Sequence, residues 1–121
     1  MRRLYDLQQE AVDLLKQHGL FAAGWRFQFD NAKNRGGQCR HGSHLITASK
    51  PIFSMEQNQV NFRNTILHEI AHALVGPGHG HDATWKRQAR AIGCTGDRCH
   101  SMQTAEGRYA GTCGCGVDHH N

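Results

Sequence analysis

The sequence predicts a small α+β domain in which one helix precedes a short sheet and two further helices lead into a cysteine-rich tail. Three patterns support this class. Apolar residues recur every three or four positions near the N-terminus, alternate with polar residues over 25–30, and cover most of a helix expected over 61–75. The length of 121 residues suits one domain with a modest core.

The first expected helix begins near the N-terminus and ends before Gly19, a typical C-terminal stop. Five apolar residues spaced along one side of this helix should face the core: Leu4, Leu7, Ala11, Leu14 and Leu15. We interpret His18, near the C-terminal end, as a surface residue that interacts with the helix dipole.

Short strands are expected next. Trp25, Phe27 and Phe29 alternate with polar residues, which indicates a strand with one buried face. Residues 34–37 should turn the chain, and residues 38–41 and 44–49 should form one or two further strands, the second ending before Pro51. Residues 50–60 are expected to form a loop or a short turn.

The helix expected over 61–75 carries two histidines four residues apart, His68 and His72, with Glu69 directly after the first. At this spacing both imidazoles lie on one side of a helix, with Cβ atoms about 5–6 Å apart, so they can bind one metal ion. Glu69 lies about 100° around the axis and can reach a metal-bound water. The spacing is typical of a zinc peptidase. The alternative is two histidines that make hydrogen bonds in the core.

The surroundings of this motif favour the metal. Asn61 is a suitable N-cap and Gly76 begins a stop signal, so the sequence marks both the beginning and the end of the helix. Burying two histidines and a glutamate is costly unless something compensates their polar groups, and a metal ion does so. Apolar residues cover much of the circumference, so the helix should be mostly buried: Phe62, Ile66, Leu67, Ile70, Ala73 and Leu74.

A catalytic zinc site needs a third protein ligand. One common zinc motif places a histidine six residues after the second, but Gly78 stands there. Another uses a glutamate on a later helix, and the only downstream glutamate, Glu106, lies in a stretch without helical character. His81 and His79 in the glycine-rich loop remain. We favour His81, because Asp82 should cap a helix over 83–92 and fix its neighbour.

The motif and the run from Gly80 to Lys86 resemble the SprT-like zinc metalloproteases. In that family a loop histidine is the third ligand and an aromatic residue follows four positions later, as Trp85 follows His81. The expected strands are also similar, and the resemblance covers most of residues 1–93. The chain looks closer to the short bacterial and phage members than to the DNA-dependent protease Spartan. The resemblance implies a zincin-like (minigluzincin-type) fold.

We therefore expect a metallopeptidase domain over 1–93 and a cysteine-rich tail over 94–121. The tail spacings do not match two C-x2-C knuckles. The resemblance implies a zinc ribbon, degenerate or cut short. Four thiolates could hold a second, structural zinc, with His119 or His120 as substitute donors; the alternative is reduced thiols or a disulfide. The four cysteines are Cys94, Cys99, Cys113 and Cys115.

Cys39, His41 and His44 could form another metal site, but no fourth ligand is close in sequence. The two histidines could instead line a substrate groove, because the strand beside such a motif helix usually receives the peptide as an added strand.

The expected activity is hydrolysis of peptide bonds by zinc-activated water, with Glu69 as general base. The auxiliary oxyanion donor stays open between Arg40, His41 and Tyr109. A second possibility is a DNA-associated protein acting on DNA-bound proteins, and a third is a non-catalytic zinc scaffold, which would not need Glu69. Candidate phosphate contacts are Lys86, Arg87, Arg90, Arg98 and Arg108.

Charge and hydropathy set further limits. The net charge of +4 and pI of about 9.0 permit contact with nucleic acid without requiring it. No apolar run approaches a membrane span, and the N-terminus does not resemble a signal peptide. We expect a soluble cytoplasmic protein, by resemblance in a bacterium or a phage-infected cell. The oligomeric state does not follow from the sequence.

Overall fold

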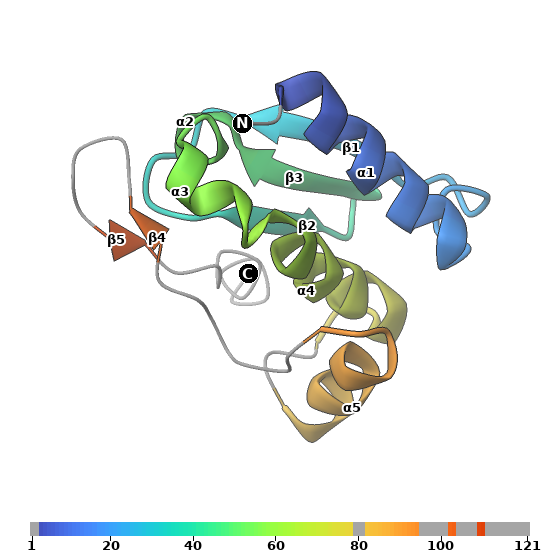
Figure 1. The fold of residues 1–121 in the computed structure, drawn as a ribbon. Coiled ribbons are helices and arrows are strands. Elements are labelled where there is room, and N and C mark those ends of the chain that lie inside the picture. Colours follow the sequence, from blue (N-terminus) through green and yellow to red (C-terminus); the bar gives the residue numbers. More distant parts are fainter. Residues whose placement is uncertain (1–2, 79–81, 95–101, 104–108, 111–121) are drawn as a thin grey trace.

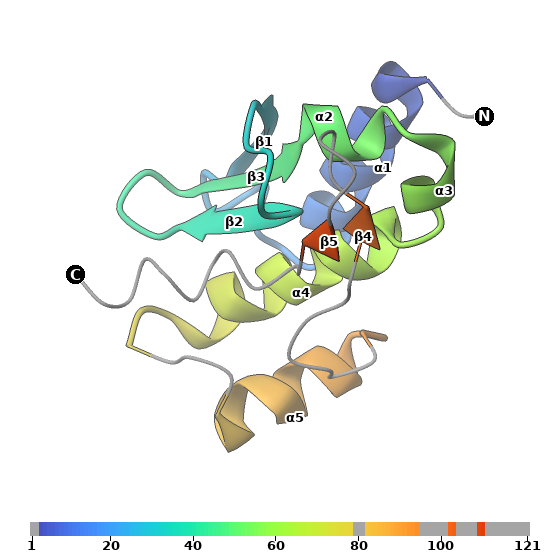
Figure 2. The same cartoon turned by 90° about the vertical axis from the view of Figure 1, so that its left-hand side faces the viewer.

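A computed structural model describes residues 3–78, 82–94, 102–103 and 109–110 of the chain. Helices α1 and α4 pack against a three-stranded sheet and against each other, and α5 packs on the opposite side of α4 from the sheet (Figure 1). Figure 2 shows the same order of layers after a quarter turn. The elements are α1 Leu4–Gln17, β1 Arg26–Asp30, β2 Gly37–Arg40, β3 Leu45–Ser49, α2 Lys50–Phe53, α3 Glu56–Gln59, α4 Phe62–Val75, α5 Ala83–Ala91, β4 Met102–Gln103 and β5 Tyr109–Ala110.

The sheet has the strand order β1-β3-β2. The central strand β3 is parallel to β1 and antiparallel to β2, with Phe27 opposite Ile46 on one side and Cys39 opposite Ile46 on the other. These three residues are buried and form the sheet's part of the core. The small α+β class, the N-terminal helix and the three strands are therefore confirmed. β2 forms one edge of this sheet.

Helix α1 confirms the expected apolar face, because Leu7, Ala11, Leu14 and Leu15 are buried. The chain then turns through Gly19, whose φ of +79° favours glycine. Our interpretation of His18 was wrong. It is half-buried, and burial lowers the pKa of its imidazole, as does the nearby positive charge of Arg63. A helix dipole would act in the opposite direction.

Residues 50–60 contain two short helices rather than a loop, so that expectation was wrong. The Ser49 side chain accepts a hydrogen bond of 3.0 Å from the Ile52 amide and caps α2, while Pro51 occupies its first turn, where a missing amide hydrogen costs nothing. The Asn58 side chain donates to the Ile52 carbonyl at 3.0 Å and ties α3 to α2. These helices lead the chain from β3 into α4.

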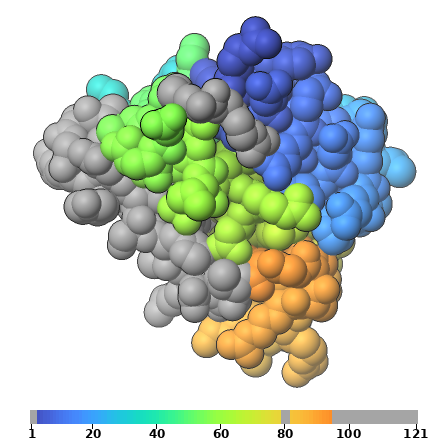
Figure 3. Space-filling view, in the orientation of Figure 1, coloured from blue at the N-terminus to red at the C-terminus, as the bar shows by residue number. Residues whose placement is uncertain are grey.

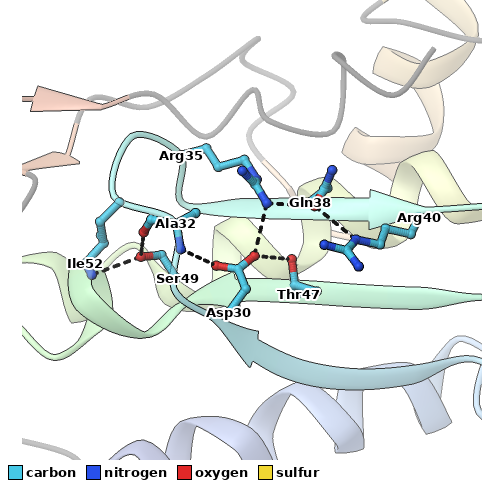
Figure 4. Close-up of polar contacts among 8 residues, drawn as sticks. All are labelled: Asp30, Ala32, Arg35, Gln38, Arg40, Thr47, Ser49 and Ile52. Atoms are coloured by element: carbon cyan, nitrogen blue, oxygen red, sulfur yellow. Dashed lines mark hydrogen bonds and ion pairs between the residues drawn. The ribbon is translucent and has the colours of Figure 1, made fainter. Parts of the chain in front are cut away.

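A polar network fixes the connection between β1 and β2 (Figure 4). Asp30 Oδ2 accepts hydrogen bonds from Thr47 Oγ1 at 2.7 Å and from Arg35 Nη2 at 3.4 Å. Arg35 also donates to Gln38 Oε1 at 2.8 Å, and the Ala32 amide donates to Asp30 Oδ1 at 3.0 Å. The network holds the loop between the strands and so determines where the edge strand β2 begins.

Helices α4 and α5 have the expected limits. α4 begins after Asn61, whose side chain makes no capping bond, and ends at Gly76 with φ +88°. Asp82 Oδ1 accepts a hydrogen bond of 2.9 Å from the Trp85 amide and caps α5. Leu74 was expected in the core but is 36% exposed, because it lies in the last turn of α4. Over the described ranges, every helix is too short or too polar to cross a membrane.

Candidate metal centre

Helix α4 holds the two motif histidines side by side. His68 and His72 are fully buried, and their ring centroids lie 5.2 Å apart. The spacing of four residues places both rings on one side of the helix, as the sequence predicts. Two imidazoles at this separation have the arrangement that a shared metal ion requires.

Trp85 of α5 packs against both histidines. Its ring centroid lies 4.7 Å from that of His68 and 5.2 Å from that of His72, and it stacks on His72 with an interplanar angle of 23°. The indole Nε1 donates to the His68 carbonyl oxygen at 3.3 Å. Because Asp82 caps the turn that carries Trp85, the start of α5 is fixed against the histidine pair.

Glu69 is also fully buried, but it faces a different neighbour. Gly37, the first residue of β2, approaches it so closely that an added Cβ would lie 3.2 Å from Glu69 Oε2. The same Cβ would lie 3.1 Å from Thr65 Cγ2 and 3.0 Å from the Thr47 carbonyl oxygen. Only glycine fits here without a shift of its neighbours. The carboxylate therefore lies directly beneath the edge strand.

The chemistry of these three residues suits a divalent metal. Two imidazoles on one side of the helix could supply two of the three protein ligands of a catalytic zinc site, and the carboxylate lies close by on another side of the helix. Burial of a carboxylate and two imidazoles is favourable only with compensating charge or hydrogen bonds. In the part of the chain that the structure describes, no three histidine, cysteine or acidic residues are close enough to hold a metal together. The predicted third ligand, His81, and its alternative, His79, lie outside that part.

Comparison with known families supports the same region. The SprT-like family matches residues 4–106, which include α1, the sheet, α4 and α5. The chain belongs to the SprT-like family. The match contains His68, Glu69, His72 and Trp85, and it continues beyond residue 93, where we expect the tail to begin. No curated protein and no solved structure gave a significant match.

The other predicted metal residues are less completely described. Cys94 is buried, with its Sγ 3.9 Å from the Asn64 carbonyl oxygen. Cys99, Cys113, Cys115, His119 and His120 lie outside the described residues, so the structural zinc stays a prediction. Cys39 Sγ lies 3.8 Å from His41 Nε2, but with His44 they form no metal-binding group among the described residues.

The candidate phosphate contacts on α5 are exposed. Lys86, Arg87 and Arg90 are exposed, whereas Trp85 and Ala89 form the buried side of the helix. The space-filling view shows α5, in orange, at the surface of the molecule (Figure 3). Arg98 and Arg108 lie outside the described residues.

The candidates for an oxyanion donor differ in position. Arg40 is exposed and its Nε donates to Gln38 Oε1 at 3.2 Å. His41 lies at the end of β2, 6.1 Å from Trp25 between ring centroids. The Tyr109 side chain lies outside the described part of the structure.

Sequence reasoning missed two contributors to the site. Gly37 was expected only to turn the chain, although a glycine at a strand end can also signal a close approach of two backbones. Trp85 supported the family resemblance, but its packing against both histidines was not foreseen. A tryptophan in the first turn of a helix, shortly after its capping residue, is the signal that could have predicted this packing.

Proposed function

We propose that this protein is a zinc-dependent metalloendopeptidase with a zincin-like catalytic centre. The observation that carries the proposal is the buried pair His68 and His72, 5.2 Å apart between ring centroids, with a buried Glu69 on another side of the helix beneath the edge strand. Membership of the SprT-like family supports it.

His68 and His72 would supply two zinc ligands, and His81 is the proposed third, with His79 as the alternative. When bound, zinc supplies Lewis acidity and lowers the pKa of water toward about 7. The imidazoles must be neutral to bind the metal. Trp85 keeps both rings in place and excludes water from their far side, since it is itself fully buried.

Glu69 is the proposed general base. It accepts the proton of the attacking water and returns it to the departing amine, as a single carboxylate can do in both halves of a hydrolysis. Its position beneath β2 suits this role, because a peptide that pairs with the edge of β2 would bring its backbone over the carboxylate.

Glu69→Gln tests the proposal. Removal of a general base should lower kcat by about 10²–10⁴-fold, while zinc content and melting temperature stay close to those of the parent. Hydrolysis of an unstructured protein substrate, followed together with metal analysis, gives both readouts. Cleavage at the parental rate by pure Glu69→Gln protein would contradict the peptidase. It would then favour a non-catalytic zinc scaffold.

A second candidate function is action on DNA-bound proteins, and the exposed basic side of α5 favours it. If Lys86, Arg87 and Arg90 contact phosphates, DNA affinity should fall steeply with salt, and replacing all three by glutamine should reduce that slope by about three. Lys50→Gln, at an exposed lysine of α2, is the matched control. A DNA affinity that does not change with salt concentration would exclude action on DNA-bound proteins.

A further inference from the structure

We propose that a pocket at the C-terminal end of α4 binds an acidic side chain of the peptide substrate; this rests on the proposed peptidase function. The pocket has a volume of about 520 Å³. Its lining comes from the start of β1, the turn between β2 and β3, and the end of α4. The main lining residues are Trp25, His41, Gly42, His44, Ala73 and Gly76.

The pocket lies along the same edge as Glu69. Ala73 follows Glu69 by four residues and so occupies the same side of α4, one turn further on. β2 begins at Gly37, beside the Glu69 carboxylate, and ends at Arg40, directly before His41. At about 3.3 Å per residue, Gly37 and His41 are about 13 Å apart along the strand. A peptide paired with β2 would therefore place a side chain in the pocket three or four residues from the cleaved bond.

The chemistry of the lining favours a carboxylate. The imidazoles of His41 and His44 contact the indole of Trp25 edge-on, with ring centroids 6.1 Å and 5.1 Å away. Imidazole N–H groups donate hydrogen bonds, and none of the lining residues is acidic.

The turn that carries both histidines is held in one conformation. The His44 amide donates to the His41 carbonyl oxygen at 3.3 Å, and the Arg26 amide donates to the His44 carbonyl oxygen at 3.0 Å. His44 has a φ of +51°, and within the described ranges no other non-glycine residue has a positive φ. Such a conformation is costly and persists when its surroundings enforce it, as is common in binding sites. The pocket is therefore formed before a substrate arrives.

The test uses two peptides that differ only by Glu or Gln at the position three or four residues from the cut, located first with a mixed peptide pool. The parent should prefer the Glu peptide by about tenfold in KM, the range of a hydrogen bond to a charged group. His44→Gly, which suits the positive φ, and His41→Ala should each bring the two KM values together. Ser43→Ala, at an exposed position of the same turn, should keep the preference.

Binding to Glu69→Gln protein, measured with two otherwise neutral peptides that differ only by one central Glu or Gln and so require no known cleavage site, separates this proposal from the peptidase. A preference for the Glu peptide in the affinity, lost in His44→Gly, supports the pocket even if no peptide is cut, and the absence of cutting then contradicts only the peptidase. Equal affinity of the two peptides, or a preference that survives both histidine variants, overturns the pocket even in an active enzyme.

Discussion

Two sides of helix α4 carry different parts of the proposed chemistry and are supported in different ways. On one side, His68 and His72 lie against the indole of Trp85, with ring centroids 4.7 Å and 5.2 Å away. On the other, Glu69 lies beneath Gly37, where even a methyl group would be crowded. The first side depends on a large side chain and the second on the absence of one.

This difference separates metal binding from proton transfer. The histidines are positioned by stacking from α5, an element that follows α4 in sequence, whereas the carboxylate is positioned by an edge strand that precedes it. Substitutions on the α5 side should therefore change zinc affinity first, and substitutions at the β2 edge should change kcat first. The two sides can be broken independently.

The largest effect is expected at the α5 side. Trp85→Ala removes a fully buried indole, so it should lower the free energy of unfolding by about 3–5 kcal/mol. Loss of the stacking that orients both ligands should also weaken zinc binding by about 10–100-fold. Denaturant unfolding and zinc titration against a competing chelator measure the two quantities.

Trp85→Phe is the matched control for that substitution, since it keeps an aromatic ring but removes the hydrogen bond to the His68 carbonyl. It should retain most of the zinc affinity. A folded Trp85→Ala protein with the parental zinc affinity would contradict the role of stacking.

A smaller effect, confined to the other side, is expected from Gly37→Ala. The new methyl group presses on Glu69 Oε2, Thr65 Cγ2 and the Thr47 carbonyl oxygen, so the carboxylate must shift by a few tenths of an ångström. We expect a fall in kcat of about tenfold with zinc content unchanged, because small displacements of a catalytic group are costly. Steady-state kinetics with metal analysis gives the answer.

The control for Gly37→Ala is a second substitution that restores space. Thr65→Ser removes the methyl group of Thr65, so the double variant should recover part of the lost kcat. If Gly37→Ala lowered zinc affinity and left kcat unchanged, the assignment of the two sides would be reversed.

The smallest effect, on stability, should come from His18, which lies on neither side of α4. Burial and Arg63 lower the pKa of His18 in the folded protein, so the unfolded chain takes up a proton first as pH falls below the ordinary histidine value of about 6.5. Stability from this residue is therefore present above that pH and is lost as pH falls through the lowered pKa. His18 is only half-buried, so this change should be the smallest of the three.

His18→Gln isolates that contribution. Urea unfolding at pH 7.5 and pH 5.5 should show a weaker loss of stability for the variant than for the parent, with kcat at pH 7.5 unaltered. A greater loss in the variant would mean that the folded protein favours the charged imidazole instead.

Local signals in the sequence were sufficient for the helices that carry the site. Asp82 as a cap, Gly76 as a stop and the apolar spacing of α4 each act within a few residues, and all three predicted the correct limits. The spacing of His68, Glu69 and His72 likewise fixed which of them share a side of the helix. By contrast, α2 was missed because Pro51, which lies in its first turn, indicated only the end of a strand, and α3 begins after Met55 without a side-chain cap.

Contacts between distant parts of the chain could not be predicted in this way. The approach of Gly37 to Glu69 depends on the network around Asp30, Arg35 and Thr47, which joins residues up to 17 positions apart. The contact between Trp85 and His68 spans the same separation and depends on how α5 packs on α4. Such distances follow from packing of the whole domain rather than from any one pattern.

The central claim is that His68 and His72 share one zinc ion with His81. The most direct test is the zinc content per chain of the purified full-length protein, measured by mass spectrometry for the parent, for His68→Ala/His72→Ala and for His81→Ala. The proposal predicts that the double variant loses one zinc per chain and that His81→Ala loses the same one. Zinc content equal to the parent's in the double variant would contradict it.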